Sequence, residues 1–130
     1  MSIILGSRSL SRLEGVHPDL VRVVKKAAAM SSLDFTVLEG LRTLERQKQL
    51  KENGATRTMN SRHLTGHAVD LAPMIGNKVS WDWPLYYELA IIVKGAAADQ
   101  DVPLQWGGDW RTFKDGPHWE LTWKAYPKGK

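Results

Sequence analysis

The sequence predicts an α+β fold in which about three helices accompany a small, mainly antiparallel sheet. Three segments show the residue spacing or end signals of helices, and about four short apolar or β-branched runs lie between them. The helices and strands interleave irregularly, which favours an antiparallel sheet over repeated strand–helix–strand units. Because 130 residues suffice for one hydrophobic core and leave no room for a second domain of normal size, residues 1–130 are expected to form a single domain.

In the first half of the chain, a few residues mark most of the element ends. Residues 7–16 are polar and predict an arm or loop. Pro18 suits the first turn of a helix, and apolar residues at helical spacing continue that helix for about three turns. A strand is expected over residues 35–38, and Thr43 is a favourable N-cap for a helix over residues 44–50.

The second half contains the longest helical pattern and the remaining strands. Residues 55–65 are polar and predict a loop, after which residues 68–72 predict a buried strand. The longest helix is expected over residues 84–99. Two short strands are expected over residues 102–106 and 119–122, which completes the sheet.

The composition excludes several classes of protein and of site. The chain has no cysteine, so disulfide scaffolds, thiol nucleophiles and thiolate metal sites are excluded, and a metal would need His, Asp or Glu ligands. A membrane-spanning helix needs about 18 consecutive apolar residues, and the chain contains no such run. We therefore expect no membrane insertion.

The net charge of +4 is concentrated in residues 1–60, which hold ten basic and six acidic side chains. This half could bind an anionic polymer such as nucleic acid, phospholipid or cell-wall polymer. So small an excess of positive charge is, however, typical of an ordinary solvated surface. We expect no nucleic-acid partner. The apolar stretch over residues 3–5 is too short for the core of a secretory signal, which predicts synthesis in the cytoplasm without a signal peptide.

The first group of candidate functional residues lies between Ser61 and Asp70. His63 falls in the polar loop and Asp70 in the apolar strand that follows, and the turn at Gly66 allows the two side chains to converge. Asp70 is flanked by apolar residues, so an unpaired carboxylate there would carry a desolvation cost. A bound cation, a salt bridge to an arginine, or hydrogen bonds to the loop backbone would each relieve this cost, and the spacing alone does not choose between them.

The second group follows a Gly-Pro turn near the end of the chain. His118 begins an apolar strand, and together with His63 and Asp70 it would form a mixed nitrogen and oxygen site suited to zinc, with a fourth position left for water. Such a site needs a general base. Asp115, three residues before His118 across the turn, is well placed, and Glu120 competes because it would share a strand face with His118.

These two segments resemble the signature of the zinc peptidases that include D-Ala-D-Ala carboxypeptidases and dipeptidases and the L-alanyl-D-glutamate endopeptidases of bacteriophage endolysins. That signature reads Ser-x-His-x-x-Gly-x-Ala-x-Asp, followed near the C-terminus by Asp/Glu-x-x-His. An upstream Gly-x-Arg-(Ser/Thr) segment followed by Gln completes it. The resemblance spans residues 14–122, and the matching residues are Gly40, Arg42, Thr43, Gln47, Ser61, His63, Gly66, Ala68, Asp70, Asp115 and His118.

The resemblance implies a metal site and a proton-transferring residue beside it. His63, Asp70 and His118 would be the ligands of a zinc ion. Asp115 would be the general base that activates the attacking water and later protonates the leaving amine. The fold would be the small α+β fold of this family.

The resemblance also implies three residues that contact the substrate. Arg42 would hold the substrate carbonyl or stabilise the tetrahedral oxyanion, although by itself it would pass for a helix-start residue or a partner of Glu39. Ser61 would hydrogen-bond the substrate or shape the ligand loop. Trp119, next to His118, would line the cleft.

Other aromatic residues have weaker claims. His67 falls at a variable position of the family pattern, so we expect it on a strand face and not among the ligands. Tryptophan side chains could stack on the sugar rings of peptidoglycan, although packing is the commoner use of tryptophan in so small a domain. These side chains are Trp106, Trp110 and Trp123.

Taken together, the resemblance implies a zinc metallopeptidase that hydrolyses the stem peptide of bacterial peptidoglycan, a bacteriolytic endolysin. Asp at position 115, where the family's dipeptidases and many of its carboxypeptidases have Glu, favours the L-alanyl-D-glutamate bond. We expect a monomer made in the cytoplasm of the host bacterium, reaching the cell wall on lysis with the help of a holin.

Two other functions remain open from the sequence. The nearer alternative is a D-Ala-D-Ala carboxypeptidase or dipeptidase, which would use the same chemistry on a different bond. The more distant alternative is a non-enzymatic module that binds the cell wall or another anionic polymer. Closed structural zinc sites have four protein ligands, whereas three are counted in this sequence, and that difference favours catalysis.

Overall fold

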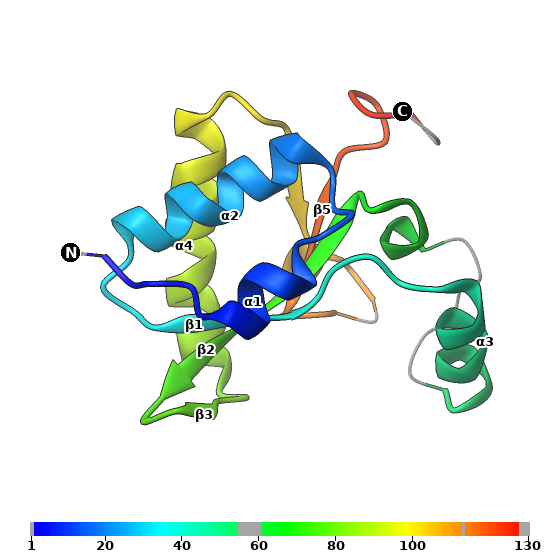
Figure 1. Cartoon of the computed structure of the whole chain (residues 1–130), viewed down its shortest axis with the longest axis horizontal. Helices are drawn as coiled ribbons and strands as arrows, with labels where there is room; N and C mark the ends of the chain where they lie inside the picture. The colour runs from blue at the N-terminus through cyan, green and yellow to red at the C-terminus, as the bar shows by residue number, and fades with distance from the viewer. Residues whose placement is uncertain (1, 55–60, 113, 128–130) are drawn as a thin grey trace.

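The structure of the chain is a computed structural model that describes residues 2–54, 61–112 and 114–127 (Figure 1). The α-helices within these ranges are α1 (Ser7–Arg12), α2 (Pro18–Met30), α3 (Leu44–Glu52) and α4 (Trp83–Asp99). The strands are β1 (Phe35–Glu39), β2 (Ala68–Ile75), β3 (Lys78–Val79), β4 (Leu104–Trp106) and β5 (His118–Leu121). Two 3₁₀ turns, η1 (Arg62–Thr65) and η2 (Gly107–Asp109), precede β2 and follow β4 respectively.

The sheet has the order β1-β2-β5-β4, and β3 pairs with the C-terminal end of β2. Every strand pair is antiparallel, so the predicted α+β fold with a mainly antiparallel sheet is confirmed. β2 and β5 are the central strands, and their register places Asp70 directly opposite His118. Two residues that lie far apart in the sequence are thus brought side by side by strand pairing.

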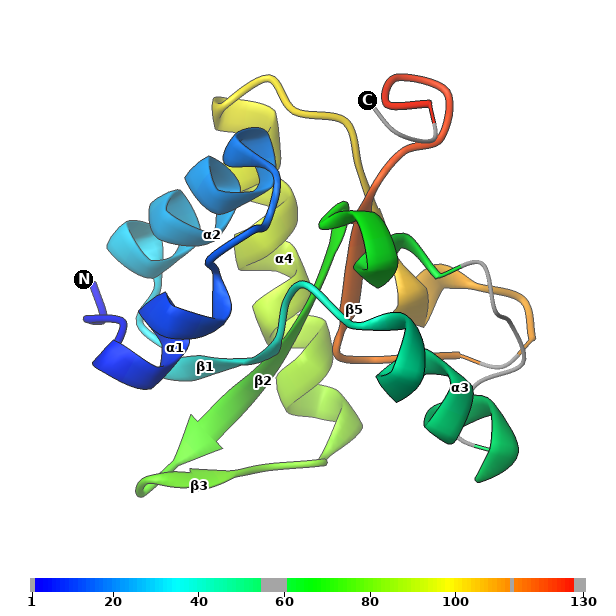
Figure 2. The same ribbon diagram turned by 45° about the vertical axis from the view of Figure 1, so that its right-hand side comes forward.

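The hydrophobic core lies between the sheet and the long helices. α4 packs against β2 and β4, and α2 packs on α4 (Figure 2). In both views α3 stands apart from α2 and α4, beyond the central strands. The inner faces of these elements supply side chains with almost no exposed surface, namely Leu20, Val23 and Val24 of α2, Leu89 and Val93 of α4, and Val69 and Leu71 of β2.

The prediction of an arm or loop over residues 7–16 is wrong, because Ser7–Arg12 forms α1. This helix has no apolar repeat to reveal it, and its contacts with the edge strand β1 stabilise it. The Ser9 hydroxyl accepts a hydrogen bond from the Val37 amide at 3.0 Å, and Arg12 donates to the Val37 carbonyl at 2.9 Å. α1 therefore satisfies backbone groups that the edge of the sheet would otherwise leave unpaired.

Other boundaries differ by small amounts. η1 forms the last part of the loop predicted over residues 55–65, and residues 55–60 lie outside the described residues. β2 continues past Pro73, because the Pro73 carbonyl accepts a hydrogen bond from the Ser80 amide at 2.9 Å as the chain returns along β3. The other predicted helices and strands begin within two residues of their expected positions. None of the helices in the described ranges is long and apolar enough to cross a membrane.

Candidate metal centre and active site

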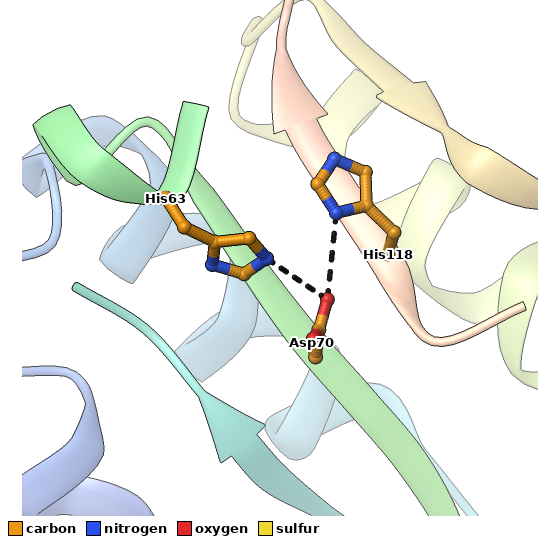
Figure 3. Close-up of side chains that lie close together, drawn as sticks. All are labelled: His63, Asp70 and His118. Atoms are coloured by element: carbon orange, nitrogen blue, oxygen red, sulfur yellow. Dashed lines mark hydrogen bonds and ion pairs between the residues drawn. The ribbon is translucent and has the colours of Figure 1, made fainter. Parts of the chain in front are cut away.

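Three side chains from separate parts of the chain converge at one end of the β2–β5 pair (Figure 3). His63 comes from η1, Asp70 from β2 and His118 from β5, and one potential ligand atom of each lies within 4.8 Å of the others. Asp70 Oδ1 is 3.1 Å from His63 Nε2 and 3.4 Å from His118 Nδ1. The structure thus brings together the three residues that the sequence singled out as ligands.

The turn around His63 fixes its main chain, and a main-chain carbonyl orients its ring. Ser61 caps η1, since its hydroxyl accepts a hydrogen bond from the His63 amide at 3.2 Å, and Gly66 ends the turn with a left-handed φ of 74°. A side chain at Gly66 would also collide with the Gly15 carbonyl. The His63 ring places Nδ1 2.8 Å from the Gly40 carbonyl oxygen, which can only accept, so Nδ1 carries the proton and Nε2 is free to face Asp70.

Arg42 lies beside this cluster and is fixed by several contacts. Its amide donates to the His63 carbonyl at 2.9 Å, which ties the segment after β1 to η1. Its guanidinium donates to Gln47 at 2.6 Å and pairs with Glu39, and Nη2 lies 3.8 Å from Asp70 Oδ2. Arg42 is therefore both a partner of Glu39 and a neighbour of the cluster, and its side chain is only 8% exposed.

His118 is held by side chains. Its Nε2 is 2.7 Å from Glu120 Oε1, and its other nitrogen faces Asp70. The half-buried Trp110 ring packs against it, with ring centroids 5.0 Å apart, and the His63 ring meets it edge-on at the same distance. His118 is thus buried, with Glu120 and Trp110 in contact with its ring outside the cluster.

The charges around the cluster shift the pKa values of its members. Burial alone would raise the pKa of Asp70, but the two histidines outweigh it and hold that pKa well below its usual range. Burial alone would lower the pKa of His118, but its contacts with Asp70 and Glu120 raise it to about 9. The carboxylate of Asp70 is thus strongly favoured in its charged form, as a cation ligand must be.

Asp115 lies on the turn that leads into β5. Its carbonyl accepts a hydrogen bond from the His118 amide at 3.2 Å, and its amide donates to the Gly107 carbonyl at 3.1 Å. A Cβ atom at Gly107 would lie 2.5 Å from the Asp115 carbonyl oxygen, so only glycine allows this close approach. Burial, and next the charge of Asp70, raise the pKa of Asp115, while His118, His63 and Arg42 act in the opposite direction. The carboxyl group of Asp115 therefore lies within electrostatic reach of the whole cluster.

The prediction that Trp119 lines the cleft is wrong. Side chains alternate along a strand, so Trp119 points away from the face that His118 and Glu120 share. It is 1% exposed and stacks on Trp106 in the core, with ring centroids 5.7 Å apart. Trp110, which follows η2, contacts His118 instead. Nothing in the sequence around Trp110 predicts this contact.

The remaining predicted residues have clear positions. Ser61 shapes the ligand turn, as one of its two expected roles requires, and its contact with substrate stays a prediction. His67 precedes β2 and bonds through Nδ1 to the Thr65 hydroxyl at 2.7 Å, outside the cluster.

The cluster of His63, Asp70 and His118 offers two imidazole nitrogens and one carboxylate oxygen. This donor set suits a metal ion such as zinc.

Comparison with known proteins gives consistent matches. A family model described as phage L-alanyl-D-glutamate peptidase matches residues 1–122. The L-alanyl-D-glutamate peptidase of Escherichia phage T5 is 32% identical over 133 residues, covering 99% of this chain and 96% of that protein. The crystal structure of the Serratia marcescens L-Ala D-Glu endopeptidase ChiX has a TM-score of 0.88 and 48% identity, covering 93% of this chain and 91% of that one.

A more distant likeness concerns the fold alone. The vancomycin resistance D,D-dipeptidase VanXYg, solved in complex with a D-Ala-D-Ala phosphinate analog, has a TM-score of 0.51 and 17% identity. The likeness covers 82% of this chain and 50% of that one. Because the family model matches nearly the whole chain and the T5 relative matches along almost its full length, the chain belongs to the phage L-alanyl-D-glutamate peptidase family.

Proposed function

We propose that this protein is a zinc-dependent peptidoglycan hydrolase that cleaves the L-alanyl-D-glutamate bond of the stem peptide. The observation that carries the proposal is the convergence of His63, Asp70 and His118 in a member of this peptidase family. Arg42 lies 3.8 Å from Asp70, and the charges of the cluster act on Asp115, which supports their proposed roles. The names of the T5 relative and of ChiX both specify this bond, which supports the choice of substrate.

The distances from Asp70 to the two histidines support zinc as the metal. Ligand atoms around a tetrahedral zinc ion lie about 3.3 Å apart, because zinc–nitrogen and zinc–oxygen bonds are about 2.0–2.2 Å long. The distances from Asp70 Oδ1 to the facing nitrogens of His63 and His118 are 3.1 and 3.4 Å. Three protein ligands are also typical of catalytic zinc sites, which keep one position open.

In the proposed mechanism, different residues bind the metal, transfer the proton of the attacking water and stabilise the negative charge on the substrate carbonyl oxygen. When bound by His63, Asp70 and His118, zinc would supply a Lewis acid that polarises the scissile carbonyl and makes water easier to deprotonate. Asp115 takes a proton from the attacking water and delivers it to the leaving amine nitrogen of D-glutamate. The guanidinium of Arg42, held by Glu39 and Gln47, donates to the substrate carbonyl oxygen as negative charge develops on it.

We propose that residues 1–130 act as one domain, which the five-stranded sheet and the core cluster of the described residues support, and that the protein is a monomer. Ser61 is proposed to hydrogen-bond the substrate in addition to capping η1. The enzyme would be made in the host bacterium and reach the wall on lysis, with a holin opening the membrane, in keeping with its phage relative.

Digestion of purified peptidoglycan tests the bond. The expected products carry a new amino group on D-glutamate and a new carboxyl group on L-alanine, both detectable by mass spectrometry. A chelator should stop the reaction, and zinc should restore it. Release of free D-alanine would instead support the carboxypeptidase alternative, and binding to the wall without any cleavage would support the non-enzymatic one.

A further inference from the structure

Glu120 is a buried acid that the proposed mechanism does not use. It follows His118 by two residues on β5, so both side chains point to the same face of the sheet. Its Oε1 lies 2.7 Å from His118 Nε2, and the two residues are 7% and 6% exposed. Because an ionised carboxylate can only accept a hydrogen bond, Nε2 of His118 carries the proton in this contact.

The contact determines which nitrogen of His118 is available to a metal. With the proton on Nε2, a neutral imidazole has its lone pair on Nδ1, and Nδ1 is the nitrogen that lies 3.4 Å from Asp70 Oδ1. His63 has the opposite arrangement, since its Nδ1 is held by the Gly40 carbonyl and its Nε2 faces Asp70. The two histidines therefore present different nitrogens to the same point.

We infer that Glu120 is a positioning residue that fixes the tautomer and the ring orientation of His118, so that Nδ1 is held ready to bind the metal. This inference rests on the proposed function, because it takes the cluster to be the zinc site. Hydrogen bonds of this kind to the second nitrogen of a ligand histidine orient the ring and raise its basicity as a ligand.

The geometry separates this role from that of a general base. Glu120 contacts the side of the imidazole ring opposite Asp70, so the ring lies between its carboxylate and the cluster. Asp115 interacts with the charges of all three proposed ligands and of Arg42, and it keeps the proposed role of general base. Glu120 acts through His118, and it makes no contact with the reacting atoms.

A buried cation nearby compensates the charge of Glu120. Arg62 is 2% exposed, and its positive charge interacts favourably with that of Glu120. The guanidinium of Arg62 is fixed by the carbonyls of Leu121 and Tyr126 and by the ring of Trp123, 4.0 Å below it. Arg62 therefore places a positive charge within electrostatic reach of the Glu120 carboxylate.

The affinity for zinc tests the inference without any peptidoglycan. We expect Glu120→Ala to weaken zinc binding by about 10–100-fold, as loss of such a partner typically does. Glu120→Gln should restore much of that affinity, because its amide oxygen can still accept a hydrogen bond from Nε2. The measurement is competition with a chromophoric chelator, using Gln105→Ala as the matched control. Gln105 pairs with Glu120 across β4 and β5 but is exposed, so its loss should leave zinc affinity unchanged.

A second measurement covers the case in which Glu120→Ala does not fold. Nitrogen NMR of the zinc-loaded wild-type protein should show His118 with a proton on Nε2 and zinc on Nδ1, and His63 with the reverse. Zinc on His118 Nε2, or a zinc affinity of folded Glu120→Ala within twofold of wild type, would overturn the inference. A wild-type protein that binds no zinc would overturn the zinc assignment as well, whereas cleavage of a different bond would change the proposed substrate alone.

Discussion

The two histidines of the candidate metal centre are supported in different ways. The His63 ring is hydrogen-bonded to a main-chain carbonyl, that of Gly40. A second hydrogen bond, between main-chain atoms, joins the Arg42 amide to the His63 carbonyl. On the His118 side, the partners are side chains, above all Glu120. The first arrangement depends on how closely two chain segments approach, and the second depends on a single replaceable carboxylate. Substitution of the residues that support His63 should therefore act mainly on stability, and substitution of the residues that surround His118 mainly on metal affinity and chemistry.

The largest effect should come from removing either ligand. We expect His63→Ala and His118→Ala each to lose zinc and all measurable hydrolysis, because two protein ligands hold the ion much less tightly than three. Elemental analysis of the purified variants checks the zinc content. If either variant kept one zinc per chain, that histidine would no longer count as a ligand, and the comparison between the two sides would fail.

The next largest effect should separate chemistry from metal binding on the His118 side. Asp115→Ala should keep zinc and the fold but lose roughly 10²–10⁴-fold in hydrolysis rate, the usual contribution of a general acid–base residue. The rate is measured on purified peptidoglycan, with zinc content and thermal unfolding as controls. Full activity in this variant would remove Asp115 from the proposed mechanism.

The third prediction concerns the stability of the His63 side. A Cβ atom at Gly40 would lie 2.1 Å from the Arg12 carbonyl oxygen and 2.7 Å from Val16 Cγ2. Gly40→Ala should therefore lower the free energy of unfolding by about 2–3 kcal/mol, as overpacking does. Urea denaturation in the presence of a chelator measures it, so that loss of zinc cannot contribute.

Gly95→Ala is the matched control for this substitution. Gly95 lies inside α4, where the nearest atom to a new Cβ is Met30 Cε at 3.7 Å. Alanine there should stabilise the protein by about 0.5–1 kcal/mol, because glycine is unfavourable in a helix interior. Equal destabilisation by both substitutions would contradict the close approach at Gly40.

The smallest effect should be a pH-dependent one at the C-terminal segment. Tyr126 donates a hydrogen bond to Asp19 at 2.7 Å, and this bond lowers the pKa of Asp19 below 3.8, against a smaller opposing effect of burial. The Tyr126 carbonyl also accepts a hydrogen bond from Arg62, the residue before His63. The chain that follows β5 is therefore joined to the turn η1, which carries His63. Because the folded-state pKa is depressed, the contribution is present above the unfolded value and is lost as the pH falls through the folded one.

Asp19→Asn tests this contact. It should cost about 1 kcal/mol of unfolding free energy at pH 7, because the Asn amide oxygen still accepts from Tyr126 but lacks the charge that strengthens this hydrogen bond. The difference from wild type should shrink towards pH 3. Urea denaturation at both pH values makes the comparison, and a difference that stays constant between them would show that ionisation of Asp19 does not contribute.

Much of the fold and of the site could be predicted because strong local signals exist for them. Pro18 and Thr43 marked helix starts, and the family resemblance of residues 61–70 and 115–118 pointed to His63, Asp70 and His118, which the structure brings together. α1 could not be predicted in this way, because its support comes from contacts of Ser9 and Arg12 with β1.

The errors at the site have different origins. Side chains alternate along a strand, so the rule that places Glu120 on the same face as His118 also places Trp119 on the opposite face. The position of Trp110 depends on the path of η2, and no periodic pattern encodes it. The Gly40 carbonyl has no side-chain signature at all, since every residue carries a carbonyl group.

The pairing of Asp70 with His118 across β2 and β5 has a consequence for the order of folding. The two residues are 48 positions apart in the chain, and closing so long a loop is slow compared with forming a helix. A slip of one residue in this pairing would turn one ligand to the opposite face of the sheet. Metal binding at this cluster during refolding should therefore wait until the two central strands have paired in the correct register, and a bound ion would then stabilise that register.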